Sequence, residues 1–205
     1  LNSVYFRDTN TGWVVGIWGS VLTTTDGGDT WNYSGLTSDA FKSIFFIDDT
    51  TGWIVGNWEG EILKTTNGGF SWDTQSSGTL SGLNAVHFCD KNHGWIVGTY
   101  GTILKTMDGG NTWHLQYKST TSEWLRSVTF TDDYTGWAVG DNGSIIKTGN
   151  GYSNWILQTS GTMNGLRSIC FADSDTGWIV GYYQILKTTN GGATWISQTN
   201  GASHD

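Results

Sequence analysis

The chain has 205 residues, and its 18 Asp and Glu outnumber its 10 Lys and Arg, so the formal net charge is −8. It contains 13 Trp and 30 Gly but no Pro, which excludes a collagen-like or Pro-rich chain. Nucleic-acid binding without sequence preference needs a basic face, and no apolar run approaches the roughly 20 residues of a membrane-spanning helix. We therefore expect no nucleic-acid partner and no membrane insertion.

Two tryptophan series show that the chain is a tandem repeat. The first series follows a glycine each time and comprises Trp13, Trp53, Trp95, Trp137 and Trp178. The second comprises Trp31, Trp72, Trp113, Trp155 and Trp195. Both series keep spacings of 40 to 42 residues over the whole length, which indicates one repeated unit. We predict a single domain, 1–205, of five units with bounds 1–40, 41–82, 83–124, 125–165 and 166–205.

The sequence pattern of each unit predicts four short strands in chain order. In the first unit these are 1–6, where a β-branched residue and Phe share one face, then 12–16, 20–25 and a segment beginning at Trp31. Four antiparallel strands repeated in this way are typical of a β-propeller blade. We predict an all-β fold, a propeller of five four-stranded antiparallel blades. No strand is exchanged between the terminal units, so closure would rest on packing alone, or the piece would belong to a larger or assembled object.

The hairpin between the third and fourth strands carries an Asp-box, first seen as TTDGGDTW at 24–31. In this pattern an Asp or Asn side chain accepts turn amides and a glycine takes positive φ. The residues at that position are Asp26, Asn67, Asp108, Asn150 and Asn190. We assign these five residues a structural role.

The Asp-boxes, together with ILKTTNGG (62–69) and TGWIVG (51–56), resemble the repeats of the photosystem II stability/assembly-factor-like family. The resemblance covers the whole chain and implies a propeller fold. The photosynthetic members look like seven-bladed rings, whereas five repeats are present here. Because this repeat serves proteins with unrelated tasks, we argue function from the residues of a site.

Aromatic residues outside the two tryptophan series gather in the turns between the second and third strands and in one link between units. They are Trp18, Trp58, Tyr100, Trp124, Tyr182 and Tyr183. Because a turn tip has no core to fill, aromatic residues there favour a surface that binds a protein or glycan. The alternative is that each tip folds over its neighbouring blade.

Three basic residues, Lys42, Arg126 and Arg167, occupy the second position of a first strand, which places them at the mouth of the central channel near the aromatic turns. This spot could meet a carboxylate, a phosphate or a neighbouring Asp. On the opposite face, the links that begin at Asp8, Asp90 and Asp173 echo the start of a calcium loop. They lack its distant Glu, so we interpret them as capped turns and expect no metal or cofactor.

We predict no catalytic residues and a non-enzymatic binding or scaffold module. Two alternatives stay open. One is a self-assembling subunit of a surface layer or filament. The other is a glycoside hydrolase using Glu59, Glu61 or Glu123, although these carboxylates are scattered over separate loops.

The low charge and the Ser, Thr, Gly and Asn content favour an extracellular, periplasmic or cell-surface location. Cys89 and Cys170 are expected to be free thiols, and Asn32 and Asn142 match the N-glycosylation pattern.

Overall fold

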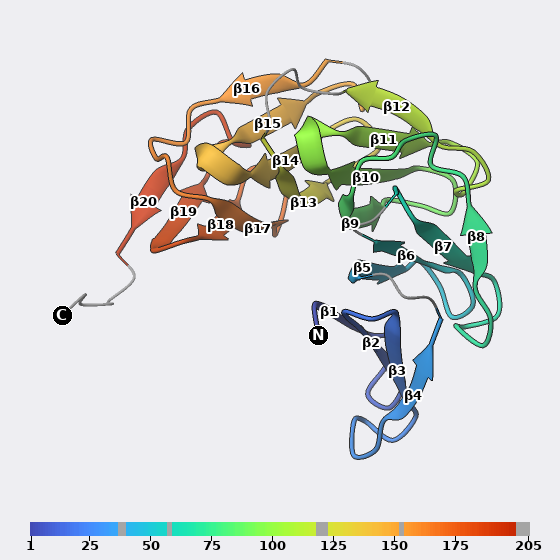
Figure 1. Ribbon diagram of the computed structural model, residues 1–205. Helices are drawn as coiled ribbons and strands as arrows, with labels where there is room; N and C mark the ends of the chain where they lie inside the picture. Colours follow the sequence, from blue (N-terminus) through green and yellow to red (C-terminus); the bar gives the residue numbers. More distant parts are fainter. Residues whose placement is uncertain (37–39, 57–58, 118–122, 152–153, 200–205) are drawn as a thin grey trace.

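The computed structural model describes residues 1–36, 40–56, 59–117, 123–151 and 154–199. These residues form five four-stranded antiparallel sheets, each built from four strands that are consecutive in the chain (Figure 1). The predicted propeller blades are therefore confirmed. The division of the chain into a single domain with those unit bounds stays a prediction.

The strand bounds follow the repeat. Blade 1 contains β1 (Ser3–Phe6), β2 (Gly12–Val15), β3 (Ser20–Thr24) and β4 (Asn32–Gly35). Blade 2 contains β5 (Phe41–Phe46), β6 (Gly52–Gly56), β7 (Ile62–Thr65) and β8 (Asp73–Gln75). Blade 3 contains β9 (Leu83–Phe88), β10 (Gly94–Gly98), η1 (Thr99–Gly101), β11 (Ile103–Thr106) and β12 (His114–Tyr117). Blade 4 contains β13 (Leu125–Phe130), β14 (Gly136–Gly140), η2 (Asp141–Gly143), β15 (Ile145–Thr148) and β16 (Ile156–Gln158). Blade 5 contains β17 (Leu166–Phe171), β18 (Gly177–Gly181), β19 (Gln184–Thr188) and β20 (Ile196–Gln198).

The core lies between blades, where an aromatic ring of one blade stacks on a ring of the next. The Trp53 ring lies 3.6 Å from the Phe88 ring, and Trp95 lies 3.7 Å from Phe130. Trp113 closes the same junction edge-on, 5.8 Å from Phe88. The first two pairs are stacked nearly parallel and the third is edge-on, and together these contacts bury a large apolar area. Each blade is therefore stabilised mainly by its neighbours.

The blades form an open arc, with blade 1 at one end and blade 5 at the other (Figure 1). Contacts run from β1 to β5, β9, β13 and β17 in turn. At equivalent positions of the first strand, Val86 is 6% exposed but Val4 is 61% exposed. Among the described residues no other blade covers this face of blade 1, so ring closure stays a prediction. No helix in the described part of the chain is long and apolar enough to cross a membrane.

The two faces of the arc carry different turns, because successive strands alternate in direction. On one face the Asp-box touches the first link of its own blade, as where the Gly27 amide donates to the Asn10 carbonyl (2.8 Å). On the other face the turn between the second and third strands meets the link between blades, as where the Asp141 amide donates to the Trp124 carbonyl (3.0 Å). We name these the Asp-box face and the aromatic face.

Candidate functional site

The aromatic face presents exposed rings at its turn tips. Trp18 and Tyr183 are each 74% exposed, and Tyr100 is also exposed. Trp58 lies outside the described residues. We name the described residues of this set the aromatic rim: Trp18, Tyr100, Trp124, Tyr182 and Tyr183. Their role in binding stays a prediction, but the turn-tip rings point into solvent rather than into a core.

The tip residues have left-handed backbone conformations. Trp18, Tyr100 and Tyr183 have φ values of 59°, 56° and 58°, and the equivalent Asn142 has a φ of 56°. Asn adopts this region readily, whereas a large aromatic residue there costs about 1 kcal/mol or more. Aromatic residues at these tips therefore contribute little to stability, which favours a role in binding.

The variant Tyr100→Asn tests this interpretation, because Asn142 occupies the same position in the next blade. We expect the free energy of unfolding to rise by about 0.5 to 1 kcal/mol, since the strain is relieved and little burial is lost. Urea unfolding measures the change. A loss of more than about 1 kcal/mol would instead show that the Tyr100 ring supports the fold.

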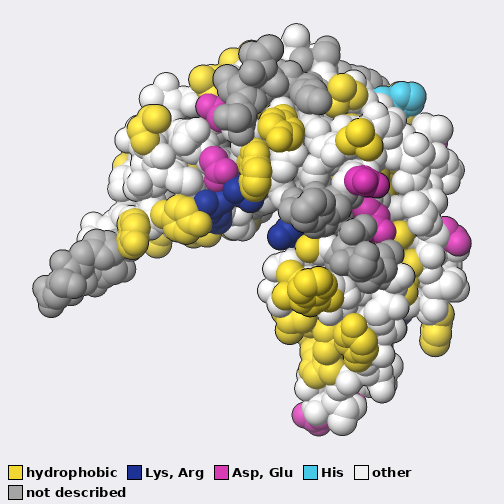
Figure 2. All heavy atoms as spheres, in the orientation of Figure 1, with side chains coloured by type: hydrophobic (Ala, Val, Ile, Leu, Met, Phe, Trp, Pro, Cys, Tyr) yellow, Lys and Arg dark blue, Asp and Glu magenta, His cyan; other side chains and the backbone are white. Residues whose placement is uncertain are grey.

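Two of the three predicted basic residues converge on one carboxylate. Arg126 Nη2 lies 2.8 Å from Asp141 Oδ2, and Arg167 Nη1 lies 2.8 Å from Asp141 Oδ1. Each guanidinium also lies over a ring of the aromatic rim, Arg126 at 4.7 Å from Trp124 and Arg167 at 4.3 Å from Tyr182. Figure 2 shows basic side chains at the inner edge of the arc beside apolar ones. We name Arg126 and Arg167 the arginine pair.

The arginine pair carries two positive charges, which balance the Asp141 carboxylate and the Glu123 carboxylate beside it, so this cluster is formally neutral in an acidic protein. Asp141, Arg167 and Tyr182 line a cavity of about 330 Å3 together with Glu123. Glu123 accepts a hydrogen bond from the Ser144 hydroxyl at 2.7 Å. Guanidinium groups stay charged and present planar donors, so the cluster can hold a further carboxylate. The convergence on Asp141 was not predictable from sequence spacing.

The third basic residue and the acidic candidates lie elsewhere. Lys42 is in β5 of blade 2, whereas Arg126 is in β13 of blade 4 and Arg167 is in β17 of blade 5. Glu59 and Glu61 line a different cavity, of about 570 Å3. The described structure thus keeps these two carboxylates apart from Glu123, as the scattered spacing predicted.

The Asp-box side chains are engaged within their own turns. Asp26 Oδ1 accepts the Thr24 hydroxyl at 2.7 Å and the Thr30 amide at 2.9 Å. Bonds from the Thr30 hydroxyl and amide, with that from Thr24, hold the pKa of Asp26 well below its usual range. Asn67 likewise accepts the Ser71 amide at 3.0 Å. Equivalent hydroxyl bonds are made to Asp108, Asn150 and Asn190. Side chains held in this way suit a turn-forming role.

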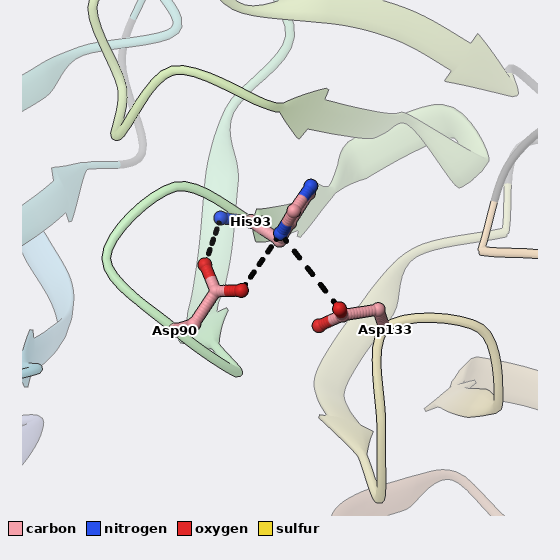
Figure 3. Close-up of side chains that lie close together, drawn as sticks. All are labelled: Asp90, His93 and Asp133. Atoms are coloured by element: carbon pink, nitrogen blue, oxygen red, sulfur yellow. Dashed lines mark hydrogen bonds and ion pairs between the residues drawn. The ribbon is translucent and has the colours of Figure 1, made fainter.

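One cluster on the Asp-box face combines an imidazole with two carboxylates (Figure 3). His93 Nδ1 lies 2.8 Å from Asp90 Oδ2 and 3.9 Å from Asp133 Oδ2 of the next blade. In the described residues this is the one group of three such side chains with ligand atoms within 4.8 Å of one another. Such donors could hold a divalent metal. Hydrogen bonding within the Asp90 turn also accounts for the geometry, so the expectation of no metal stays a prediction.

The fold and the repeats define a class of protein, the Asp-box β-propellers. The family described as photosynthesis system II assembly factor YCF48 matches residues 1–82, 72–165 and 114–203. The chain belongs to this family, and the resemblance seen in the repeats is confirmed.

Solved structures agree on the fold. YCF48 bound to D1 peptide is 23% identical with a TM-score of 0.52, covering 96% of this chain and 79% of that one. YCF48 from Cyanidioschyzon merolae is 19% identical with a TM-score of 0.52, covering 97% and 84%. An ancestral GH74 enzyme is 16% identical with a TM-score of 0.81, covering 98% of this chain and 31% of that one. At these identities the likeness shows the fold alone. No curated protein matches the chain significantly.

The family corrects one prediction. The extracellular, periplasmic or cell-surface location expected from composition is wrong, because the chain belongs to a family of photosystem II assembly factors. The physical reason is that low charge and many Gly and Asn residues follow from a chain of paired strands and tight turns. The composition therefore reports the architecture and not the compartment.

Proposed function

We propose that this chain is a non-enzymatic, protein-binding propeller whose aromatic face takes an extended peptide segment carrying a carboxylate. The observation that supports this most directly is the arginine pair, with two guanidinium groups on one Asp141 carboxylate and each lying over an aromatic ring. Each guanidinium has five N–H donors and uses only some of them on Asp141, so the remaining donors can bind a further carboxylate. The exposed rings of the aromatic rim offer apolar surface to the rest of the peptide.

A YCF48 structure holds a D1 peptide, which makes a peptide the first ligand class to test. A fluorescently labelled D1 peptide is therefore the probe, with a version whose carboxylates are replaced by amides. Arg167→Gln removes one charge from the pair while Arg126 still neutralises Asp141. We expect it to weaken binding about tenfold or more, since a hydrogen bond to a charged group contributes about 1.5 to 3 kcal/mol.

Lys91→Gln is the matched control, because it removes the same charge from the Asp-box face, where Lys91 pairs with Asp48 at 2.9 Å. Its affinity should equal that of the unaltered chain. Fluorescence anisotropy measures both. Equal binding by Arg167→Gln and the unaltered chain, or equal binding of the amide peptide, would contradict the proposal.

Three alternatives are separated by other measurements. Glycan binding by the aromatic rim predicts hits on a glycan array that Trp18→Asn removes. Self-assembly into a layer or filament predicts a particle mass that grows with concentration in light scattering. Hydrolysis predicts turnover on a sugar panel, which we do not expect because the arginine pair holds Asp141 and the Ser144 hydroxyl occupies Glu123.

A further inference from the structure

A cavity of about 430 Å3 lies on the Asp-box face at the junction of blades 1 and 2. Trp13 and Thr23 of blade 1 form one wall, and Gly68 and Phe70 of the next Asp-box form the other. Asp49, from the first link of blade 2, also lines it. This cavity lies on the face opposite the arginine pair, so an inference from it does not depend on the function proposed above.

The repeat shows what fills this place elsewhere. Thr23 lies opposite Trp13 in the β2–β3 pairing, and the residue at that position is lysine in the other four blades. These residues are Lys64, Lys105, Lys147 and Lys187. Each ammonium lies over the tryptophan of its own blade, at 5.8, 4.9, 5.0 and 5.4 Å from the ring centre. In the other four blades, a lysine packed on a tryptophan therefore occupies this position.

Two of these lysines also bridge to the next blade. Lys147 Nζ donates to the Gly191 carbonyl at 2.7 Å, and Lys64 Nζ donates to Asn111 Oδ1 at 3.2 Å. Gly68 is the equivalent of Gly191 in blade 2 and lines the cavity. The short side chain of Thr23 cannot carry an ammonium to it. Blade 1 therefore keeps the acceptor and the ring but lacks the lysine ammonium that joins them in blade 4.

Arg7 covers part of the Trp13 ring, with its guanidinium carbon 5.8 Å from the ring centre. Its donors are used in the surrounding turns: Nη1 donates to the Asp49 carbonyl at 2.9 Å, and Nε lies 3.3 Å from Asp8 Oδ2. The Asp49 carboxylate is 3.7 Å from Nε. The cavity lining therefore holds one guanidinium and one carboxylate, Asp49, so the charge of Arg7 is balanced within the lining.

We propose that this cavity binds an alkylammonium group, and specifically the lysine side chain of a protein partner that docks on the Asp-box face. The ammonium would take the place that the chain's own lysines occupy at the other junctions, with the Gly68 carbonyl as acceptor, the Trp13 ring beside it and the Asp49 carboxylate at the rim. The four-carbon stem of a lysine would lie along Thr23 and Phe70.

The probe is n-butylammonium chloride, with n-butanol as the uncharged control at the same ionic strength. Backbone and indole NMR signals of the 205-residue chain report where each compound binds. We expect saturable chemical-shift changes at the Trp13 indole and at the Gly68 and Gly69 amides. The Kd should be on the order of millimolar, because the ligand is so small. Butanol should give at least tenfold weaker binding. Equal affinity for the two compounds would overturn the proposal.

The chain supplies its own matched variants. Thr23→Lys places the residue of the other four blades in the cavity and should abolish the shifts at Gly68. Lys64→Thr should open the same space at the next junction and create new saturable shifts at Trp53 and Gly109. Asp49→Asn removes charge without filling the cavity and should weaken binding several-fold.

Unchanged binding in Thr23→Lys would overturn the proposal, as would an unchanged Kd in Asp49→Asn. Spermidine distinguishes a lysine side chain from a free polyamine. A spermidine Kd within about tenfold of that of butylammonium supports a lysine, since one ammonium then accounts for the affinity. Much tighter binding of spermidine would assign the cavity to polyamines and contradict the lysine assignment.

Discussion

Replacement of Phe88 by alanine is expected to lower the free energy of unfolding by about 3 to 5 kcal/mol, because Phe88 is buried between Trp53 and Trp113 and the change leaves a cavity. The same replacement at Phe6, the equivalent residue of blade 1, is expected to cost less than about 2 kcal/mol. Phe6 is 42% exposed and meets Trp31 edge-on at 5.9 Å, and in the described part of the chain no tryptophan of another blade stacks on it.

Val86→Ala and Val4→Ala form a second matched pair at one position of the repeat. Val86→Ala should lower the free energy of unfolding by about 1 to 2 kcal/mol. Val4→Ala should lower it by only about a few tenths of a kcal/mol, since Val4 is mostly exposed. Urea unfolding of all four variants measures the differences, with an unchanged m-value as the control for two-state behaviour. If the two variants of either pair lose the same free energy of unfolding, the face of blade 1 is covered and the arc closes.

Stability is expected to fall as the pH is lowered from about 6.5 towards 4, by roughly 2 kcal/mol, through the titration of His87. Burial lowers the pKa of His87 to about 4. Its ring packs between those of Phe45 and Phe130, at 5.5 and 6.3 Å. The unfolded chain has a histidine pKa of about 6.5, so between these values it binds a proton that the folded state does not. The stabilisation from the neutral His87 is therefore complete above the histidine pKa of the unfolded chain. It is lost as the pH falls towards the pKa of His87 in the folded protein.

His87→Thr is the matched control, because Thr129 occupies this position in the next blade. Chemical unfolding at pH 7, 6, 5 and 4.5 should give a flatter pH dependence for the variant than for the unaltered chain. Asp26 and Asp48 titrate below this window. Hydrogen bonds lower the pKa of Asp26, and at Asp48 burial raises the pKa but is outweighed by Lys91 together with hydrogen bonds from Thr50 and Thr51. Parallel pH profiles for the two proteins would contradict the assignment to His87.

Local chemistry made much of the fold predictable from the sequence. The residues equivalent to Trp53 and to Phe88 recur once in each blade. Alternation along a strand places them on a buried face. Asp26 bonds only within its own turn, so its role is contained in eight consecutive residues. The exposed tips at Trp18, Tyr100 and Tyr183 were also predictable, because a hairpin turn points away from the sheet.

The candidate sites depend on contacts between blades, which sequence spacing does not reveal. Arg126 and Arg167 lie in different blades yet share Asp141, and His93 meets Asp133 only across a junction. The substitution of Thr23 for lysine is visible in the repeat, but the cavity that it leaves requires the facing Asp-box of blade 2.

The sequence by itself determined the repeat, the strand order, the turn chemistry and the family, because each depends on residues close together in the chain. Only the tertiary structure decided which charges meet, which end face of the arc is left open and where a junction is incompletely filled. Those outcomes depend on how one blade is placed against the next, since a side chain such as Val4 is buried or exposed by its neighbour and not by its own strand.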